Sequence, residues 1–312
     1  MSGQQLSKKA DMALADLTSD GGLLNPEQND TFIRNLLDAP TMLRSVRQFP
    51  MDTPEARINK IGFGSRILRA APQGTSPYAE DDGTNDRWLA AAERSAPTTS
   101  QVPLTTKEVI AEIRIPYEVL EDNIERGNLE NTILALIAER AALDLEELII
   151  LGDDGSGDTY IALENGVLKR TTSHVVDAAN AEISASIFNN MKKALPTKYR
   201  RNLNTMRFFV SMDRESDYRL KVSGRETGLG DSILTGNQIL PVLGIGMSPV
   251  ALMPNANGLL CNPQNIIFGI QRNVRIEQDR EIRSREIIIV LTARVGLAIE
   301  EEDAMVKLIN LG

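Results

Sequence analysis

The feature that most constrains the fold is a long stretch with helical periodicity at residues 128–150. Its apolar residues recur on one face at helical spacing, namely Leu134, Ala138, Ala141, Leu145 and Leu148. At about 1.5 Å rise per residue the helix would run roughly 33 Å, which is long for a compact domain. A second face starts apolar and ends charged (Leu129, Ile133, Leu136, then Arg140, Asp144, Glu147). We therefore expect the first half of this helix to be buried on two sides and the second half on one.

The segments on either side of this helix are a strand and a turn. The preceding residues alternate as a strand, with Val109, Ala111, Ile113 and Ile115 on one face, and Pro116 ends it. The run from Gly152 to Asp158 that follows the helix is a glycine-rich turn.

This order of elements resembles the major capsid proteins of tailed phages with the Hong Kong 97-like fold. The resemblance is carried by TTKEVIAEIRIPYEVLEDN and NLENTILALIAERAALDLEELIILGDDGSGDT, including an E-x-L-x-D turn at Glu118, Leu120 and Asp122. It implies an α+β fold, with a long spine helix packed against an antiparallel sheet in a peripheral domain. It also implies an α/β axial domain, an extended two-stranded loop and an N-terminal arm.

The resemblance and the composition along the chain together predict five parts. Residues 1–50 would be the arm, 51–115 the extended loop as a long β-hairpin, and 116–183 the peripheral domain with its spine helix. The axial domain would cover 184–260, and residues 261–312 would return to the peripheral domain as strands.

The extended loop carries most of the functional argument. Ile61, Phe63, Ser65 and Ile67 alternate as an ascending strand, and 105–115 is expected to return beside it. Each strand would extend roughly 35 to 50 Å at about 3.3 Å per residue. A two-stranded hairpin of that length is not stable alone in water, so we expect a neighbouring subunit to support it. The alternative is that residues 70–103 form an active-site lid, although no cluster of catalytic residue types lies at its base.

Nine residues are candidates for contacts between subunits. Tyr78, Trp88 and Leu89 are the large apolar groups between the two strands of the loop, and Arg66 and Arg69 lie at the end of its ascending strand. By the resemblance, the glycine-rich segment 223–237 would lie near a symmetry axis, which makes Arg225 and Glu226 candidates. Arg283 and Arg285 belong to a charged turn that is either a solvated hairpin tip or a loop meeting its copies at three-fold contacts.

The remaining helices and strands are predicted from hydrophobic periodicity and from the residues that begin or end such elements. Residues 160–163 and 166–168 are expected to form a small hairpin, and Ser184 to cap a helix over 185–195 whose inner face is Ile187, Phe188, Met191 and Leu195. Residues 206–212 should be a buried strand, followed by a short helix capped by Asp213. Short strands are expected at 240–242, 250–253 and 258–261. The alternation from Ile287 to Ile299 predicts a long strand in the same sheet as 105–115, and 305–309 should complete that sheet.

Composition excludes several classes of protein. The single cysteine, Cys261, forbids an intrachain disulfide, and the single histidine, His174, leaves no material for histidine-based metal sites or Ser/His/Asp triads. No apolar run approaches the roughly 18 residues that span a bilayer, so no membrane is expected as a partner. The formal net charge of −9 argues against a dedicated nucleic-acid binder but suits the wall of a DNA container, which should not hold its cargo through phosphate contacts.

Motifs for bound groups also fail. Gly62-Phe63-Gly64 opens no helix, the turn at 152–158 lacks the bidentate glutamate of a calcium loop, and Gly228-Leu229-Gly230 lacks the lysine of a phosphate loop. We therefore expect no cofactor, no metal and no catalytic residue. Some members of the resembled family cross-link a loop lysine to a neighbour, but no lysine lies between Lys60 and Lys107, so non-covalent shells are expected. The short N-terminal segment leaves no room for a long scaffolding segment, which implies a separate scaffold protein or a short arm in that role.

The sequence thus predicts a major capsid protein that assembles as pentamers and hexamers into an icosahedral shell around the double-stranded DNA of a tailed phage. Portal and cement proteins are further possible partners, and assembly would occur in the host cytoplasm before the protein becomes part of the virion. The alternative is an encapsulin, a nanocompartment of the same fold that holds a protein cargo. A carboxylate-based hydrolase is a third class, which would need a pocket with paired, perturbed acids.

Overall fold

The computed structural model describes residues 42–63, 66–70, 94–118, 129–224, 240–271 and 275–312. The chain divides into two compact units. The larger one, here called the body, comprises Met1–Glu55 and Thr105–Gly312. The smaller one, Ala56–Leu104, is called the hairpin unit. Each is described separately.

A five-stranded sheet forms one half of the body. Its central strand is β12 (Glu286–Ile299), which pairs with β10 (Ile266–Gln271) and β11 (Arg275–Glu281) along one edge and with β4 (Lys107–Pro116) along the other. These pairs are antiparallel, whereas β1 (Arg47–Met51) joins β10 in parallel. The predicted pairing of residues 105–115 with the long C-terminal strand is confirmed. The predicted inner face is confirmed as well, since Ile289, Leu291 and Val295 are at most 5% exposed.

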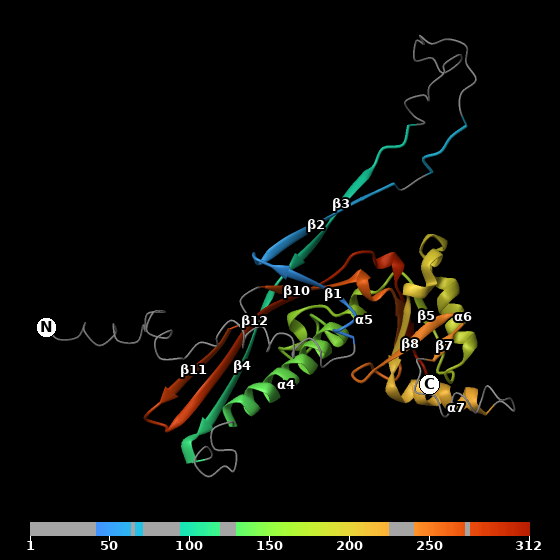
Figure 1. Cartoon of the computed structure of the whole chain (residues 1–312). Helices are drawn as coiled ribbons and strands as arrows, with labels where there is room; N and C mark the ends of the chain where they lie inside the picture. The colour runs from blue at the N-terminus through green and yellow to red at the C-terminus, as the bar shows by residue number, and fades with distance from the viewer. Residues whose placement is uncertain (1–41, 64–65, 71–93, 119–128, 225–239, 272–274) are drawn as a thin grey trace, which may run out of the picture. The chain divides into compact units, whose positions relative to one another are not determined.

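The spine helix α4 (Leu129–Leu151) packs against this sheet (Figure 1). Ala138, Leu145 and Leu148 of the predicted stripe are buried in one core with residues of β12. The predicted distribution of burial along the helix is wrong, however, because Leu136 in the first half is 59% exposed. The second half is the more enclosed one, since Ala142 and Ile149 share the core with Met42, Leu43 and Val167 from other segments.

Two glycines join the end of α4 to the next segment. A Cβ on Gly152 would lie 2.1 Å from the carbonyl oxygen of Glu164, and one on Gly166 would lie 2.7 Å from the nitrogen of Gly152. The Gly166 N–H donates to the Gly152 carbonyl at 2.8 Å. The predicted hairpin at 160–168 is wrong: these residues form the 3-10 helix η2 (Ile161–Leu163) and the start of α5 (Val167–Arg170). The close approach of the glycines lets Val167 and Leu168 reach the core from a helical turn.

A six-stranded sheet forms the other half of the body, in the order β5 (Val175–Asp177), β13 (Val306–Ile309), β9 (Gly258–Cys261), β6 (Arg207–Ser211), β8 (Ile245–Val250) and β7 (Pro241–Val242). Both faces of this sheet are buried. Phe209 and Leu259 enter the core of α4, whereas Phe208 and Leu260 enter a second core. Burial on both faces explains why these strands are continuous apolar runs.

Helices α6 (Ala185–Ala194) and α7 (Met212–Ser223) contribute to the second core, and the 3-10 helix η3 (Thr197–Thr205) follows α6. The inner face predicted for α6 is confirmed, since all four of its residues are buried. The ring of Phe188 lies 4.7 Å from that of Phe208 and 5.3 Å from that of Tyr218. The cap predicted for the next helix is wrong, because Ser211 and not Asp213 accepts the N–H of Arg214.

Sheet membership at the C-terminus also differs from the expectation. Residues 305–309 were predicted in the sheet of the spine, but β13 pairs with β9 and β5. The strand predicted at 250–253 is wrong, because β8 ends at Val250 and residues 251–253 form a turn. The short 3-10 helices η4 (Pro263–Asn265) and η5 (Glu302–Ala304) complete the body.

The hairpin unit contains two strands, β2 (Glu55–Gly62) and β3 (Thr98–Thr105), which pair only with each other among the described residues. The expectation that 105–115 returns beside the ascending strand is therefore wrong, since β3 takes that place. Thr106 separates β3 from β4, and both its N–H and its hydroxyl donate to the Pro54 carbonyl, at 2.9 and 3.1 Å. The ascending strand also ends earlier than predicted, at Gly62.

Candidate assembly surfaces

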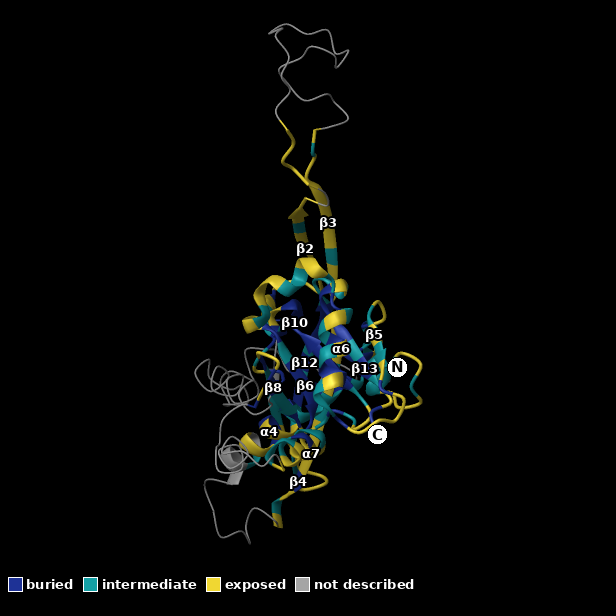
Figure 2. Cartoon of the chain, turned by 90° about the vertical axis from the view of Figure 1, so that its right-hand side faces the viewer, coloured by how far each residue is buried: buried dark blue, intermediate teal, exposed yellow. Residues whose placement is uncertain are grey.

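The hairpin unit exposes large apolar side chains. Ile61 is 75% exposed and Leu68 83%, and Phe63 and Ile67 each expose about half of their surface (52% and 53%). Figure 2 shows β2 and β3 largely in the colour of exposed residues. Among the described residues, neither of the two apolar cores includes any residue of this unit. A cluster of exposed apolar side chains on an element without a core is typical of a surface that another molecule covers.

Arg66 and Arg69 lie on this unit just beyond the end of β2, and both are exposed. The Arg66 carbonyl accepts a hydrogen bond from the Ser95 hydroxyl at 3.1 Å, which holds the two sides of the unit together past the paired strands. Tyr78, Trp88 and Leu89 lie outside the described residues, as does the tip of the loop.

The turn between β11 and β12 carries Arg283 and Arg285, both exposed. Ile282 beside them is 85% exposed. Arg285 has a φ of 58°, and its carbonyl accepts the N–H of Tyr117 at 2.9 Å, so the turn is tied to the end of β4. Arg225 and Glu226 lie outside the described residues. The structure thus places Arg283 and Arg285 on the body, and Arg66 and Arg69 on the hairpin unit.

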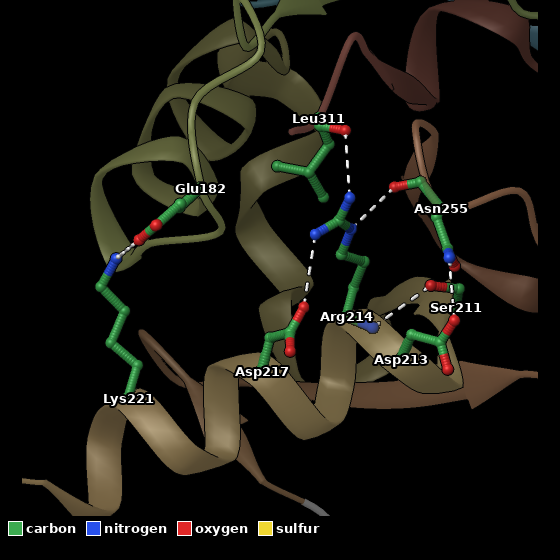
Figure 3. A network of polar contacts seen from close by, with 8 residues as sticks. All are labelled: Glu182, Ser211, Asp213, Arg214, Asp217, Lys221, Asn255 and Leu311. Carbon is green, nitrogen blue, oxygen red and sulfur yellow. Dashed lines mark hydrogen bonds and ion pairs between the residues drawn. The ribbon is translucent and has the colours of Figure 1, made fainter.

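A polar network on α7 was not anticipated from the sequence (Figure 3). The Arg214 guanidinium donates to the carbonyls of Asn255 and Leu311, at 3.1 and 3.4 Å, and pairs with Asp217 at 3.3 Å. Asn255 in turn donates to Asp213 at 2.8 Å. Arg214 therefore ties the C-terminal residues and the 255 turn to α7. The sequence could have indicated only that Arg214 lies in the first turn of a helix. Which backbone carbonyls its guanidinium contacts depends on the tertiary structure.

Side chains whose chemistry could be catalytic include a cysteine, a tyrosine and the histidine. Cys261 is fully buried, and burial raises the pKa of its thiol. Burial also raises the pKa of Tyr160, helped by the nearby Asp144 and Glu147. The His174 Nε2 lies 3.9 Å from Asp303 Oδ1. Within the described ranges, no three or more His, Cys, Asp or Glu side chains gather as a metal site, and no helix there is long and apolar enough to cross a membrane.

Comparisons with known proteins agree on one family. The model of the phage capsid family matches residues 21–309. The prophage capsid protein YqbE of Bacillus subtilis (strain 168) is 43% identical over 323 aligned positions, which cover 100% of this chain and 99% of the relative. Among solved structures, the satellite phage P4 procapsid has a TM-score of 0.65 at 14% identity, covering 96% of this chain and 95% of that one. Microbacterium phage Oxtober96 gives 0.62 at 13% identity, with 97% and 99% covered. The chain is therefore a capsid protein with the Hong Kong 97-like fold and belongs to the phage capsid family.

Proposed function

We propose that this capsid protein packs as pentamers and hexamers into an icosahedral shell that encloses double-stranded DNA. The observation that carries the proposal is the hairpin unit, which has two strands, no share in either described core and four exposed large apolar side chains. Burying one such side chain completely is worth about 1.5 to 3 kcal/mol. A neighbouring copy that covers this surface would gain several kcal/mol and would supply the support that the hairpin lacks.

The five-part division of the chain belongs to this proposal. In it, 1–50 is an arm, 51–115 an extended loop, 116–183 and 261–312 the peripheral domain, and 184–260 the axial domain, with two changes that the structure requires. Residues 107–116 (β4) belong to the five-stranded sheet of the body, and residues 306–309 (β13) belong to its six-stranded sheet. The nine candidate contact residues keep their proposed roles at subunit interfaces, with Arg283 and Arg285 either at a three-fold contact or at a solvated tip.

The net charge of the chain supports a proposal for what the shell encloses. The formal net charge of −9 favours a wall that encloses DNA without sequence-specific binding. The proposed role is structural, with no enzymatic activity. Scaffold, portal and cement proteins are proposed partners, and the host cytoplasm is the proposed place of assembly.

An encapsulin-type compartment with a protein cargo is the second candidate, because it shares the fold. The 43% identity to a prophage capsid protein over the whole chain favours the capsid. The two differ in content, so the ultraviolet absorbance of particles isolated from the native host separates them. Particles rich in nucleic acid support the capsid, and particles with protein cargo alone support the compartment.

The hairpin argument has a direct test. Ile61→Asp places a charge on the exposed face of β2 and should reduce the yield of shells at least roughly ten-fold, since about 1.4 kcal/mol corresponds to that factor. Asn59→Asp is the matched control, because Asn59 is also exposed on β2 and the change adds the same charge without removing an apolar group. Sedimentation and electron microscopy measure the yield. Normal shells from Ile61→Asp would contradict the proposal.

A further inference from the structure

One segment of this acidic chain is strongly basic. Residues 184–212 contain Lys192, Lys193, Lys198, Arg200, Arg201 and Arg207 but no aspartate or glutamate, whereas the whole chain has a formal net charge of −9. The segment comprises α6, η3 and β6. Such a concentration of one sign favours a partner of the opposite sign.

Half of these cations are held by backbone carbonyls. Lys192 donates to the carbonyl of Leu243 at 3.2 Å, Arg200 to those of Leu195 and Lys193, and Arg207 to those of Asn204 and Met206. Carbonyls satisfy the N–H donors but bring no formal negative charge. The positive charge of the segment therefore remains uncompensated by these contacts.

Two exposed cations of the segment, Lys198 and Arg201, line a pocket. It has a volume of about 590 Å³, and its lining includes Arg47, Lys198, Tyr199, Arg201, Glu300 and Glu301. Lys198 lies over the ring of Tyr199, 4.5 Å from its centre. Arg201 is exposed and has no hydrogen bond or ion pair within the described part of the chain. Glu300 pairs with Arg47 at 2.9 Å, and Glu301 accepts a hydrogen bond from the Tyr199 hydroxyl, so both carboxylates in the lining have partners.

The size and lining of the pocket favour a peptide over duplex DNA. A duplex presents a broad rod of phosphates, whereas a pocket of about 590 Å³ admits a few side chains. The amides of Asn202, Asn262 and Gln264 in the lining can pair with a polypeptide backbone. An acidic loop with several carboxylates is the partner with matching chemistry.

The chain itself contains an acidic segment of this kind. Residues 80–86 carry Glu80, Asp81, Asp82 and Asp86 with no lysine or arginine among them. They lie outside the described residues but within the sequence span of the hairpin unit. We propose that this pocket receives the acidic segment 80–86 of a neighbouring copy. The inference rests on the proposed function, because that function brings the hairpin unit of one subunit onto another.

A charge swap tests the pairing. Lys198→Glu with Arg201→Glu should lower the yield of shells at moderate salt at least roughly ten-fold, and Asp81→Lys with Asp82→Lys should do the same. The four changes combined should restore the yield to within a few-fold of the wild type. Lys193→Glu is the control, because Lys193 is exposed on α6 but does not line the pocket, so the change should leave the yield unchanged. Circular dichroism melts confirm that each variant still folds.

The outcomes separate this inference from the proposed function. If the wild type forms no shells, the proposed function fails. If the wild type forms shells and Lys198→Glu with Arg201→Glu does so equally well, the pocket assignment is overturned. If both double variants fail and the combined variant fails too, the pairing with residues 80–86 is overturned. If the pocket variant forms normal shells that contain less nucleic acid, the pocket contacts DNA and the inference is equally wrong.

Discussion

Glu146 is the residue whose role is hardest to see in the sequence. It lies on α4 with an exposed fraction of 1%, and its carboxylate accepts the backbone N–H of Met42. Helical periodicity assigns a glutamate to the solvated side, yet Ala142, Glu146 and Ile149 form a second buried stripe. The partner is 104 positions away in the chain, so no local pattern reveals it.

Removing this carboxylate should destabilise the body. Glu146→Ala leaves the Met42 N–H buried without that acceptor, which should lower the free energy of unfolding by about 1 to 3 kcal/mol. Glu146→Gln keeps an oxygen acceptor and should lose less. Glu139→Ala on the exposed side of the same helix is the control, and urea denaturation is the measurement. Equal stability of Glu146→Ala and Glu139→Ala would refute the assigned role.

Glu302 gives a prediction for pH. Its carboxylate accepts the hydroxyl of Thr172 at 2.7 Å and the N–H groups of Thr172 and Ser173 at 2.8 and 3.0 Å. These bonds, led by the hydroxyl, lower the pKa of Glu302. Because the folded pKa lies below the unfolded one, the stabilisation is present above the unfolded pKa and is lost as pH falls through the folded pKa.

The Glu302→Gln variant should therefore be less stable than the wild type at neutral pH, and the difference should shrink toward pH 3. Chemical denaturation at a series of pH values measures it. Glu147→Gln, which removes a carboxylate from the spine helix α4, is the reference with which the pH dependence of Glu302→Gln is compared. A constant difference between wild type and Glu302→Gln at all pH values would show that the carboxylate charge is not responsible.

At the scale of elements, the sequence predicted those with a long, strong period. The spine helix, β12 and the inner face of α6 are present at the expected residues, because ten or more residues of consistent periodicity leave little choice of structure. The short strands were harder to place. Val306–Ile309 has four residues, and nothing within it specifies whether it joins the sheet of β12 or that of β9. Such pairing is decided by tertiary packing.

The Gly152–Gly166 junction leaves no room for an added methyl group. Gly152→Ala would place a Cβ 2.1 Å from the Glu164 carbonyl oxygen, so backbone must move. We expect a loss of roughly 1 to 3 kcal/mol or more and a low yield of soluble subunits. Gly157→Ala is the matched control, since its Cβ would meet nothing within 4 Å. Thermal melting of both variants tests this, and equal melting temperatures would contradict it.

At the scale of the whole molecule, the resemblance to tailed-phage capsid proteins predicted the fold. The residues proposed to form contacts between subunits stay predictions. Contacts between subunits depend on how copies pack, and a single chain does not contain that information. Arg66, Arg69, Arg283 and Arg285 are exposed as an interface residue of a free subunit would be, but so are many surface residues. The charge distribution at the pocket of Arg201 became visible only when the fold placed β1 and η3 at one cavity.

The chain should form shells without covalent bonds between subunits. No lysine lies between Lys60 and Lys107, so the loop cannot supply the amine for an isopeptide bond. Purified shells boiled in detergent should migrate as one band at the subunit mass of 34.3 kDa. Ladders of higher mass would show that another amine reacts.

The connection through Thr106 has a mechanical consequence. The chain runs from β3 through this one residue into β4, which is hydrogen-bonded to β12 in continuous register from Lys107 to Pro116. A pull that enters the body along β4 would load all of these bonds together in shear instead of opening them one after another. Tension applied through the hairpin unit would thus be carried at this point by the whole β4–β12 ladder.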